Sequence, residues 1–131
     1  MTVAAGTQQG QGQGKEGQDR LGQALACFVE AYQARPELVA EQRGWSPVIA
    51  LAASDTGARA VVSLEDGRVA RVGGEARPAT LEVRADLDIL CDVLMLRRDP
   101  NEPYLFGELS VQGAEADFVR LDYIVSRLCP T

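Results

Sequence analysis

The chain contains no histidine. The Ser-His-Asp and Cys-His catalytic arrangements both use an imidazole as general base, and many zinc sites use it as a ligand. Without it, only rarer catalytic solutions remain, such as a lysine base or a pair of carboxylates. We therefore predict that the protein is not an enzyme. No residue pattern in the sequence indicates a catalytic residue, a metal site or a cofactor.

Basic residues are also scarce. Thirteen Lys and Arg stand against nineteen Asp and Glu, the formal net charge is −6, and the longest basic cluster is Arg97-Arg98. Binding to nucleic acid depends on a basic face that releases counterions, and docking on anionic membranes depends on polybasic segments. The charge of this chain therefore argues against both partners.

Long apolar runs are absent as well. No segment approaches the roughly 18 apolar residues of a spanning helix, so we predict no stable membrane insertion. The first residues, MTVAAGTQQGQGQG, lack the basic start and the apolar middle of a secretory signal, and we expect a cytoplasmic protein. The three cysteines, Cys27, Cys91 and Cys129, are far apart and have apolar neighbours. We expect them to be buried thiols.

The chain divides into two parts by composition. Residues 1–18 are rich in Gly and Gln and have no apolar period, so we expect a flexible tail that cannot offset its own ordering entropy. The pattern changes at Asp19. A length of 131 residues suits one core, and residues 19–131 are predicted to form a single domain.

The hydrophobic periods predict a definite order of elements. We expect a helix over 19–34, a short helical piece after Pro36, and strands between 45 and 83 that include a tight hairpin at the EDGR of 65–68. A helix over 87–96 with Asp86 as its N-cap, a loop over 97–103, a strand from 104 to 112 and an amphipathic helix over 114–128 follow. This order predicts an α+β fold whose sheet is covered by helices on one face.

Three segments resemble the sterol carrier protein type 2 family, the sterol-binding-domain proteins. They are the strand pair with its EDGR hairpin, ATLEVRADLDILCDVL at 79–94, and YLFGELSVQGAEADFVRLDYI at 104–124. The resemblance covers about residues 21–128. In that family a strand with the pattern aromatic-x-Gly-x-Leu-x-Val-x-Gly leads into the last helix, and the matching positions here are Phe106, Gly107, Leu109, Val111 and Gly113.

The resemblance implies a fold and a function. The family fold is a five-stranded mixed, mostly antiparallel sheet, covered on one face by helices and enclosing an apolar tunnel. It implies non-enzymatic binding or transfer of a lipid, whether fatty acyl, acyl-CoA, isoprenoid or sterol-like. The residues that it would place in the tunnel wall are Leu94, Met95, Phe106, Leu109, Leu121 and Val125.

Several alternatives stay open at this point. Each wall residue has the period of an ordinary core residue. Arg97 and Arg98 would suit an anionic head group, or they lie in a solvated loop or form salt bridges with Asp99 or Glu102. Trp45 is either a partner anchor or lipid gate, or a core aromatic at a strand edge. An accessory protein with the same fold and a collapsed cavity, supporting a larger enzyme complex, is the alternative function. The oligomeric state is left open.

Overall fold

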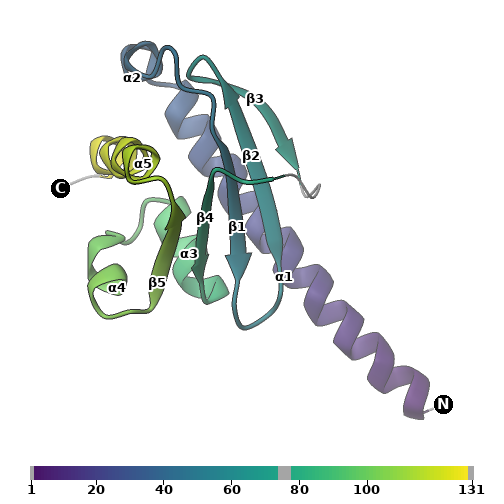
Figure 1. Ribbon diagram of the computed structural model, residues 1–131. Helices are drawn as coiled ribbons and strands as arrows, with labels where there is room; N and C mark the ends of the chain where they lie inside the picture. The colour runs from purple at the N-terminus through teal and green to yellow at the C-terminus, as the bar shows by residue number, and fades with distance from the viewer. Residues whose placement is uncertain (1, 74–77, 130–131) are drawn as a thin grey trace.

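A five-stranded sheet is the centre of the structure, a computed structural model that describes residues 2–73 and 78–129 (Figure 1). Its strand order is β3-β2-β1-β4-β5. Among these strands β1 and β4 run parallel, and the other neighbours are antiparallel. The bounds are β1 (Val48–Ala53), β2 (Arg59–Glu65), β3 (Arg68–Gly73), β4 (Leu81–Ala85) and β5 (Leu109–Gly113). The predicted α+β class with a mixed, mostly antiparallel sheet is confirmed.

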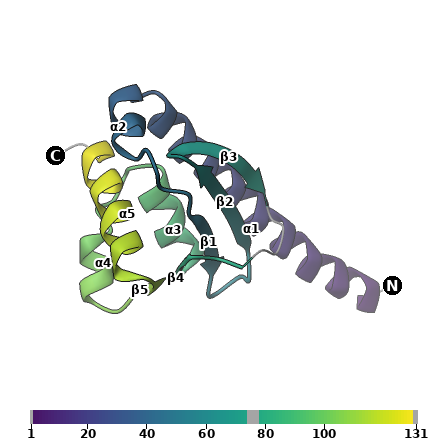
Figure 2. The same cartoon turned by 45° about the horizontal axis from the view of Figure 1, so that its top comes forward.

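The helices cover one face of this sheet. In Figures 1 and 2, α1 and α3 lie side by side behind the strands, and α5 lies next to β5 with α4 below it. The bounds are α1 (Thr2–Gln33), α2 (Pro36–Glu41), α3 (Leu87–Leu94), α4 (Asn101–Leu105) and α5 (Glu115–Leu128). The buried core cluster joins residues of α1, α3 and α5 with residues of β1, β2, β4 and β5.

Helix α1 begins at Thr2, earlier than the apolar period indicates. Its first turns extend past the edge of the sheet (Figure 1). Contact with the sheet begins near the buried Gly17 and at Gln18. The Gln18 side-chain amide donates to the Arg59 carbonyl and accepts from the Arg59 N–H. The flexibility of residues 1–18 stays a prediction.

The predicted hairpin between β2 and β3 is confirmed. Asp66 and Gly67 form its turn with φ angles of 54° and 82°, which suit the Asp-Gly sequence of a tight hairpin. Glycine is needed at the second position for a further reason. A Cβ on Gly67 would lie 2.7 Å from the carbonyl oxygen of Gln42, so the turn packs directly on the chain that follows α2.

The segment before β5 differs from its prediction. Residues 97–103 were expected to form a loop, with a strand from 104, but α4 occupies Asn101–Leu105 and β5 starts only at Leu109. A proline is tolerated in the first turn of a helix, where its N–H would lack an intrahelical partner, and Pro103 lies in that turn. Gly107, with φ of 77°, then turns the chain toward the strand.

Asp86 is the N-cap residue of helix α3, as expected, but its side chain does not supply the cap hydrogen bond. Its carboxylate accepts a hydrogen bond from the Ser54 hydroxyl at 3.0 Å. The Leu87 N–H instead donates to the Asp55 carboxylate at 2.9 Å, so the loop after β1 supplies the cap. The helix also ends at Leu94, because Met95 and the residue after it leave the helical conformation.

The expectation for the cysteines is correct at one position. Cys91 is buried on α3, and burial raises the pKa of its thiol. Cys129 is half-buried, and Cys27 is exposed on α1. Cys27 follows the buried Leu25 by two residues, and positions two apart on a helix point in different directions, so apolar sequence neighbours do not guarantee burial.

Candidate functional site

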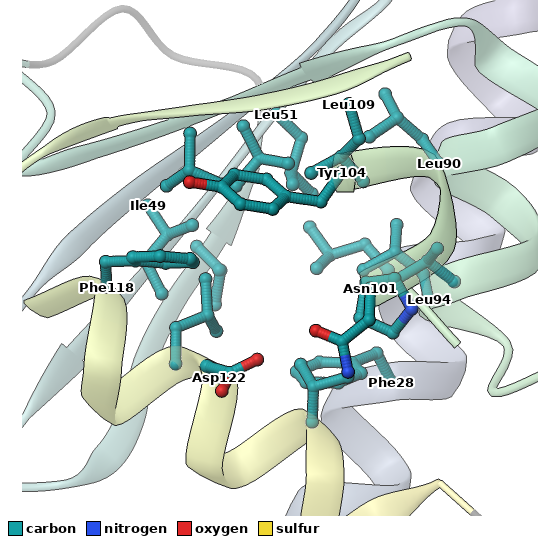
Figure 3. Close-up of a pocket in the computed structure, with 18 residues that line it drawn as sticks. Phe28, Ile49, Leu51, Leu90, Leu94, Asn101, Tyr104, Leu109, Phe118 and Asp122 are labelled. Carbon is teal, nitrogen blue, oxygen red and sulfur yellow. The ribbon is translucent and has the colours of Figure 1, made fainter. Parts of the chain in front are cut away.

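An apolar cavity of about 160 Å³ lies between the helical face of the sheet and helices α4 and α5 (Figure 3). Its lining side chains are Leu25 and Phe28 of α1, Ile49 and Leu51 of β1, Val62 of β2, Val83 of β4, Leu90, Val93 and Leu94 of α3, Pro100, Asn101 and Tyr104 at α4, Leu109 and Val111 of β5, and Phe118, Leu121, Asp122 and Val125 of α5.

The strand register produces the floor of the cavity. Leu51 is opposite Val83, and Val83 is opposite Val111, so three apolar side chains form one row across β1, β4 and β5. Ile49 is opposite Val62 in the same way. Alternate residues of a strand face the same side, so the period of two in these strands directs the whole set toward the helices.

Helix α5 is attached to the rest of the protein along one side. The Trp45 indole N–H donates to the Asp117 carboxylate at 2.8 Å, and the Arg120 guanidinium lies 5.7 Å from the Trp45 ring centroid. Arg120 also donates to the Gln42 side chain at 3.1 Å. Trp45 is 7% exposed, which agrees with a core aromatic at a strand edge. These contacts tie α5 to the segment after α2 and leave its other side facing the cavity.

The polar groups of the cavity belong to α4 and α5. Asn101 and Asp122 are both exposed, so the cavity meets solvent between these two helices. Figure 3 shows the Asn101 amide and the Asp122 carboxylate directed toward one another across the cavity. The Tyr104 ring packs near Phe118 with its centroid 5.5 Å away. The sheet, α1 and α3 contribute only apolar side chains to the lining.

The paired arginines do not belong to this site. Arg98 lies 3.8 Å from the carboxylates of Glu102 and Glu108, and Arg97 lies 3.2 Å from that of Asp92. Neither arginine lines the cavity. The structure therefore agrees with the ion-pair alternative, of which Glu102 is one expected partner.

Four of the six residues that the resemblance implied as tunnel wall line the cavity, and two do not. Leu94, Leu109, Leu121 and Val125 line the cavity. Met95 and Phe106 do not, and they are 38% and 76% exposed. Phe106 lies at the end of α4 and not in a strand, so the alternation expected for a strand does not apply to it.

Other lining residues were missed by sequence reasoning. Leu25 and Phe28 lie within the helix predicted over 19–34, but periodicity does not show which part of the core that helix contacts. Asp122 carries a clearer signal, since it follows Phe118 by four residues and precedes Val125 by three. Residues at these offsets share a helix face, so Asp122 interrupts the apolar stripe of α5. An acidic residue on an apolar stripe indicates a polar position at the edge of an apolar surface.

Two further kinds of site are absent from the described part of the chain. Within residues 2–73 and 78–129, no group of three His, Cys, Asp or Glu side chains is placed to hold a metal ion. In the same ranges no helix has both the length and the apolar character needed to cross a membrane.

Known proteins resemble the chain in structure and not in sequence. It matches no protein-family model and no curated protein. The crystal structure of sterol carrier protein 2 superposes with a TM-score of 0.59 and 17% identity, over 82% of this chain and 95% of that one. The palmitated SCP2L2 from Aedes aegypti gives 0.56 and 16%, over 76% and 91%.

A larger protein contains a region of similar fold. The sec-alkylsulfatase Pisa1 from Pseudomonas sp. superposes with a TM-score of 0.52 and 16% identity, over 71% of this chain. The matched region is 14% of the sulfatase, so this chain spans a small part of that enzyme's length. Near-complete coverage in the two smaller proteins shows that the likeness extends over the sheet and its covering helices. The chain therefore has the sterol carrier protein 2 fold.

Proposed function

We propose that this protein binds an apolar small molecule of the lipid class reversibly, in the cavity between the sheet and α5, without catalysing a reaction on it. The observation that carries the proposal is the cavity itself, which apolar side chains from the sheet and from α1, α3 and α5 surround. The proposed wall includes Leu94, Leu109, Leu121 and Val125. The palmitated SCP2L2 from Aedes aegypti has the same fold, which supports the proposal.

The size of the cavity limits what enters it without rearrangement. A volume of about 160 Å³ is close to that of an engineered apolar cavity of about 150 Å³ that binds benzene. Six carbon atoms would contribute roughly 5 kcal/mol at about 0.8 kcal/mol per CH₂. Association costs about 4 to 15 kcal/mol, so a tightly bound chain requires a larger cavity.

Helix α5 is the element whose movement would enlarge the cavity. Of its fourteen residues, all within the described part of the chain, Ile124 and Val125 are buried. Elements with few buried apolar contacts open at the lowest free energy. The polar contacts of Asp117 and Arg120 hold one side of α5 at Trp45 and Gln42, and would act as a hinge for its outward rotation.

The experiment compares two tryptophan substitutions on α5. Leu121→Trp fills the cavity and should weaken binding of a neutral fluorescent dye, such as Nile red, at least tenfold. Val119→Trp adds the same side chain at a position that is 57% exposed and outside the lining, and should leave binding unchanged. Circular dichroism checks that both variants fold. Equal binding by Leu121→Trp and the wild-type protein would contradict the proposal.

An accessory protein with the same fold and a collapsed cavity is the second candidate. It is favoured by the volume of about 160 Å³, which lies below the roughly 300 to 1,000 Å³ of ordinary ligand pockets. Native mass spectrometry separates the two functions. A lipid that co-purifies at one per chain supports the carrier, whereas an unshifted mass after incubation with long-chain alcohols, isoprenoids and fatty acids supports the accessory protein.

A further inference from the structure

The charged side chain that lines the cavity is acidic. Asp122 is the acidic residue of the lining, and no lysine or arginine among the described residues lines it. Arg97 and Arg98, the nearest basic pair in the sequence, are engaged with Asp92, Glu102 and Glu108. A ligand with an anionic head group would therefore meet a carboxylate and no compensating cation.

The Asp122 carboxylate is also available to a ligand. Within the part of the chain that the structure describes, it has neither a hydrogen bond nor an ion pair, whereas Asp117 on the same helix is bonded to Trp45. An ionised carboxylate only accepts hydrogen bonds. The Asn101 amide across the cavity both donates and accepts, and the Tyr104 hydroxyl does so as well.

From this arrangement we propose that the cavity selects apolar ligands whose polar end donates a hydrogen bond, such as an alcohol or an ammonium group, and rejects carboxylates with the same chain. The inference rests on the proposed function and names its ligand class. The apolar part of the ligand would lie against the sheet, and its polar end would lie between α4 and α5, with the donated hydrogen bond on Asp122 and a second contact on Asn101. The net charge of −6 also disfavours the approach of an anionic ligand.

The test uses three ligands with one chain length, namely decanol, decylamine and decanoate, measured by displacement of Nile red at pH 7.5. At this pH the amine is cationic and the acid is anionic. We expect decanol and decylamine to bind at least about tenfold more tightly than decanoate, because a second negative charge close to Asp122 is unfavourable.

Two variants that each remove one negative charge test whether Asp122 causes this preference. Asp122→Asn keeps the shape of the side chain and removes its charge, and should bring decanoate to within about threefold of decanol. Glu115→Gln removes one negative charge from the first turn of the same helix, outside the lining, and should leave the difference between the ligands unchanged. Leu121→Trp should weaken all three ligands, which excludes unspecific binding of the amine to the acidic surface.

The outcomes separate this inference from the function on which it rests. Decanoate that binds the wild-type protein as tightly as decanol overturns the ligand class and leaves lipid binding intact. A difference that persists in Asp122→Asn overturns the role of Asp122. Failure of all three ligands to displace the dye overturns both proposals.

Discussion

The two halves of the covered sheet face differ in how their helices close them. Over β2 and β3, helix α1 contributes Leu21, Ala24 and Tyr32, which are 0%, 1% and 3% exposed. Over β4 and β5, helix α5 buries Ile124 and Val125, and the cavity lies beneath it. The strands of both halves carry the same kind of inward-facing aliphatic side chains, so the covering helix decides whether a core or a cavity forms.

This difference is one of packing density. Protein interiors normally leave few voids larger than a water molecule. A space of only about 30 Å³ lies beside Tyr32, Leu64 and Val69 in the α1 half, whereas the space under α5 is about 160 Å³. The α1 half is therefore more densely packed, and the larger cavity under α5 lowers the contribution of that half to the stability of the fold.

The largest effect should come from truncating the same residue type in each half. Leu21→Ala removes a side chain that is 0% exposed from the packed half and should lower the free energy of unfolding by about 3 to 5 kcal/mol. Leu94→Ala, at 7% exposed, enlarges an existing cavity and should cost about 2 to 3 kcal/mol, because its side chain has fewer partners. Urea denaturation gives both values. Equal losses would remove the distinction between the halves.

The second effect concerns the attachment of α5. Trp45→Phe removes the hydrogen bond to Asp117 and should lower stability by about 1 to 2 kcal/mol. Hydrogen exchange should become faster in α5 and stay unchanged in α1, because only α5 loses an anchor. Tyr123→Phe, which removes an exposed bond to Glu41, is the matched control and should cost less than about 0.5 kcal/mol. Faster exchange in α1 would show that the two halves open together.

The smallest effect is confined to alkaline pH and to the packed half. Tyr32 donates a hydrogen bond to the Gly67 carbonyl at 2.6 Å, and burial raises the pKa of its hydroxyl to about 12. The unfolded chain loses this proton near pH 10, and the folded chain keeps it to higher pH. Stability should therefore decline between pH 10 and 12, since the unfolded state binds fewer protons there.

Tyr32→Phe should remove this contribution to the decline, as measured by denaturation at pH 9 and pH 11. Tyr104→Phe, at a tyrosine that is 43% exposed beside the cavity, should retain the decline. An identical pH dependence in Tyr32→Phe and the wild-type protein would show that the Tyr32 hydroxyl is not the group responsible.

Part of the fold was readable from the sequence because its signals are local. The Asp-Gly turn at Asp66 requires positive φ at its second residue, and the apolar period of 114–128 fits one helix closely. The α4 segment was not readable. Its two prolines indicate a loop by the usual rule, and the short helix forms because Pro103 falls in the first turn, where a proline costs no hydrogen bond.

The sequence by itself determined the class of fold and the lack of imidazole chemistry, because composition and hydrophobic period can be read from the order of the residues alone. Tertiary structure alone decided which apolar residues became core and which became wall. Leu21 of α1 and Leu121 of α5 have the same helical period, but Leu21 is fully buried in the core and Leu121 borders a cavity. That outcome depends on the distance between a helix and the sheet, which is set by contacts such as Trp45 with Asp117 between residues far apart in the chain.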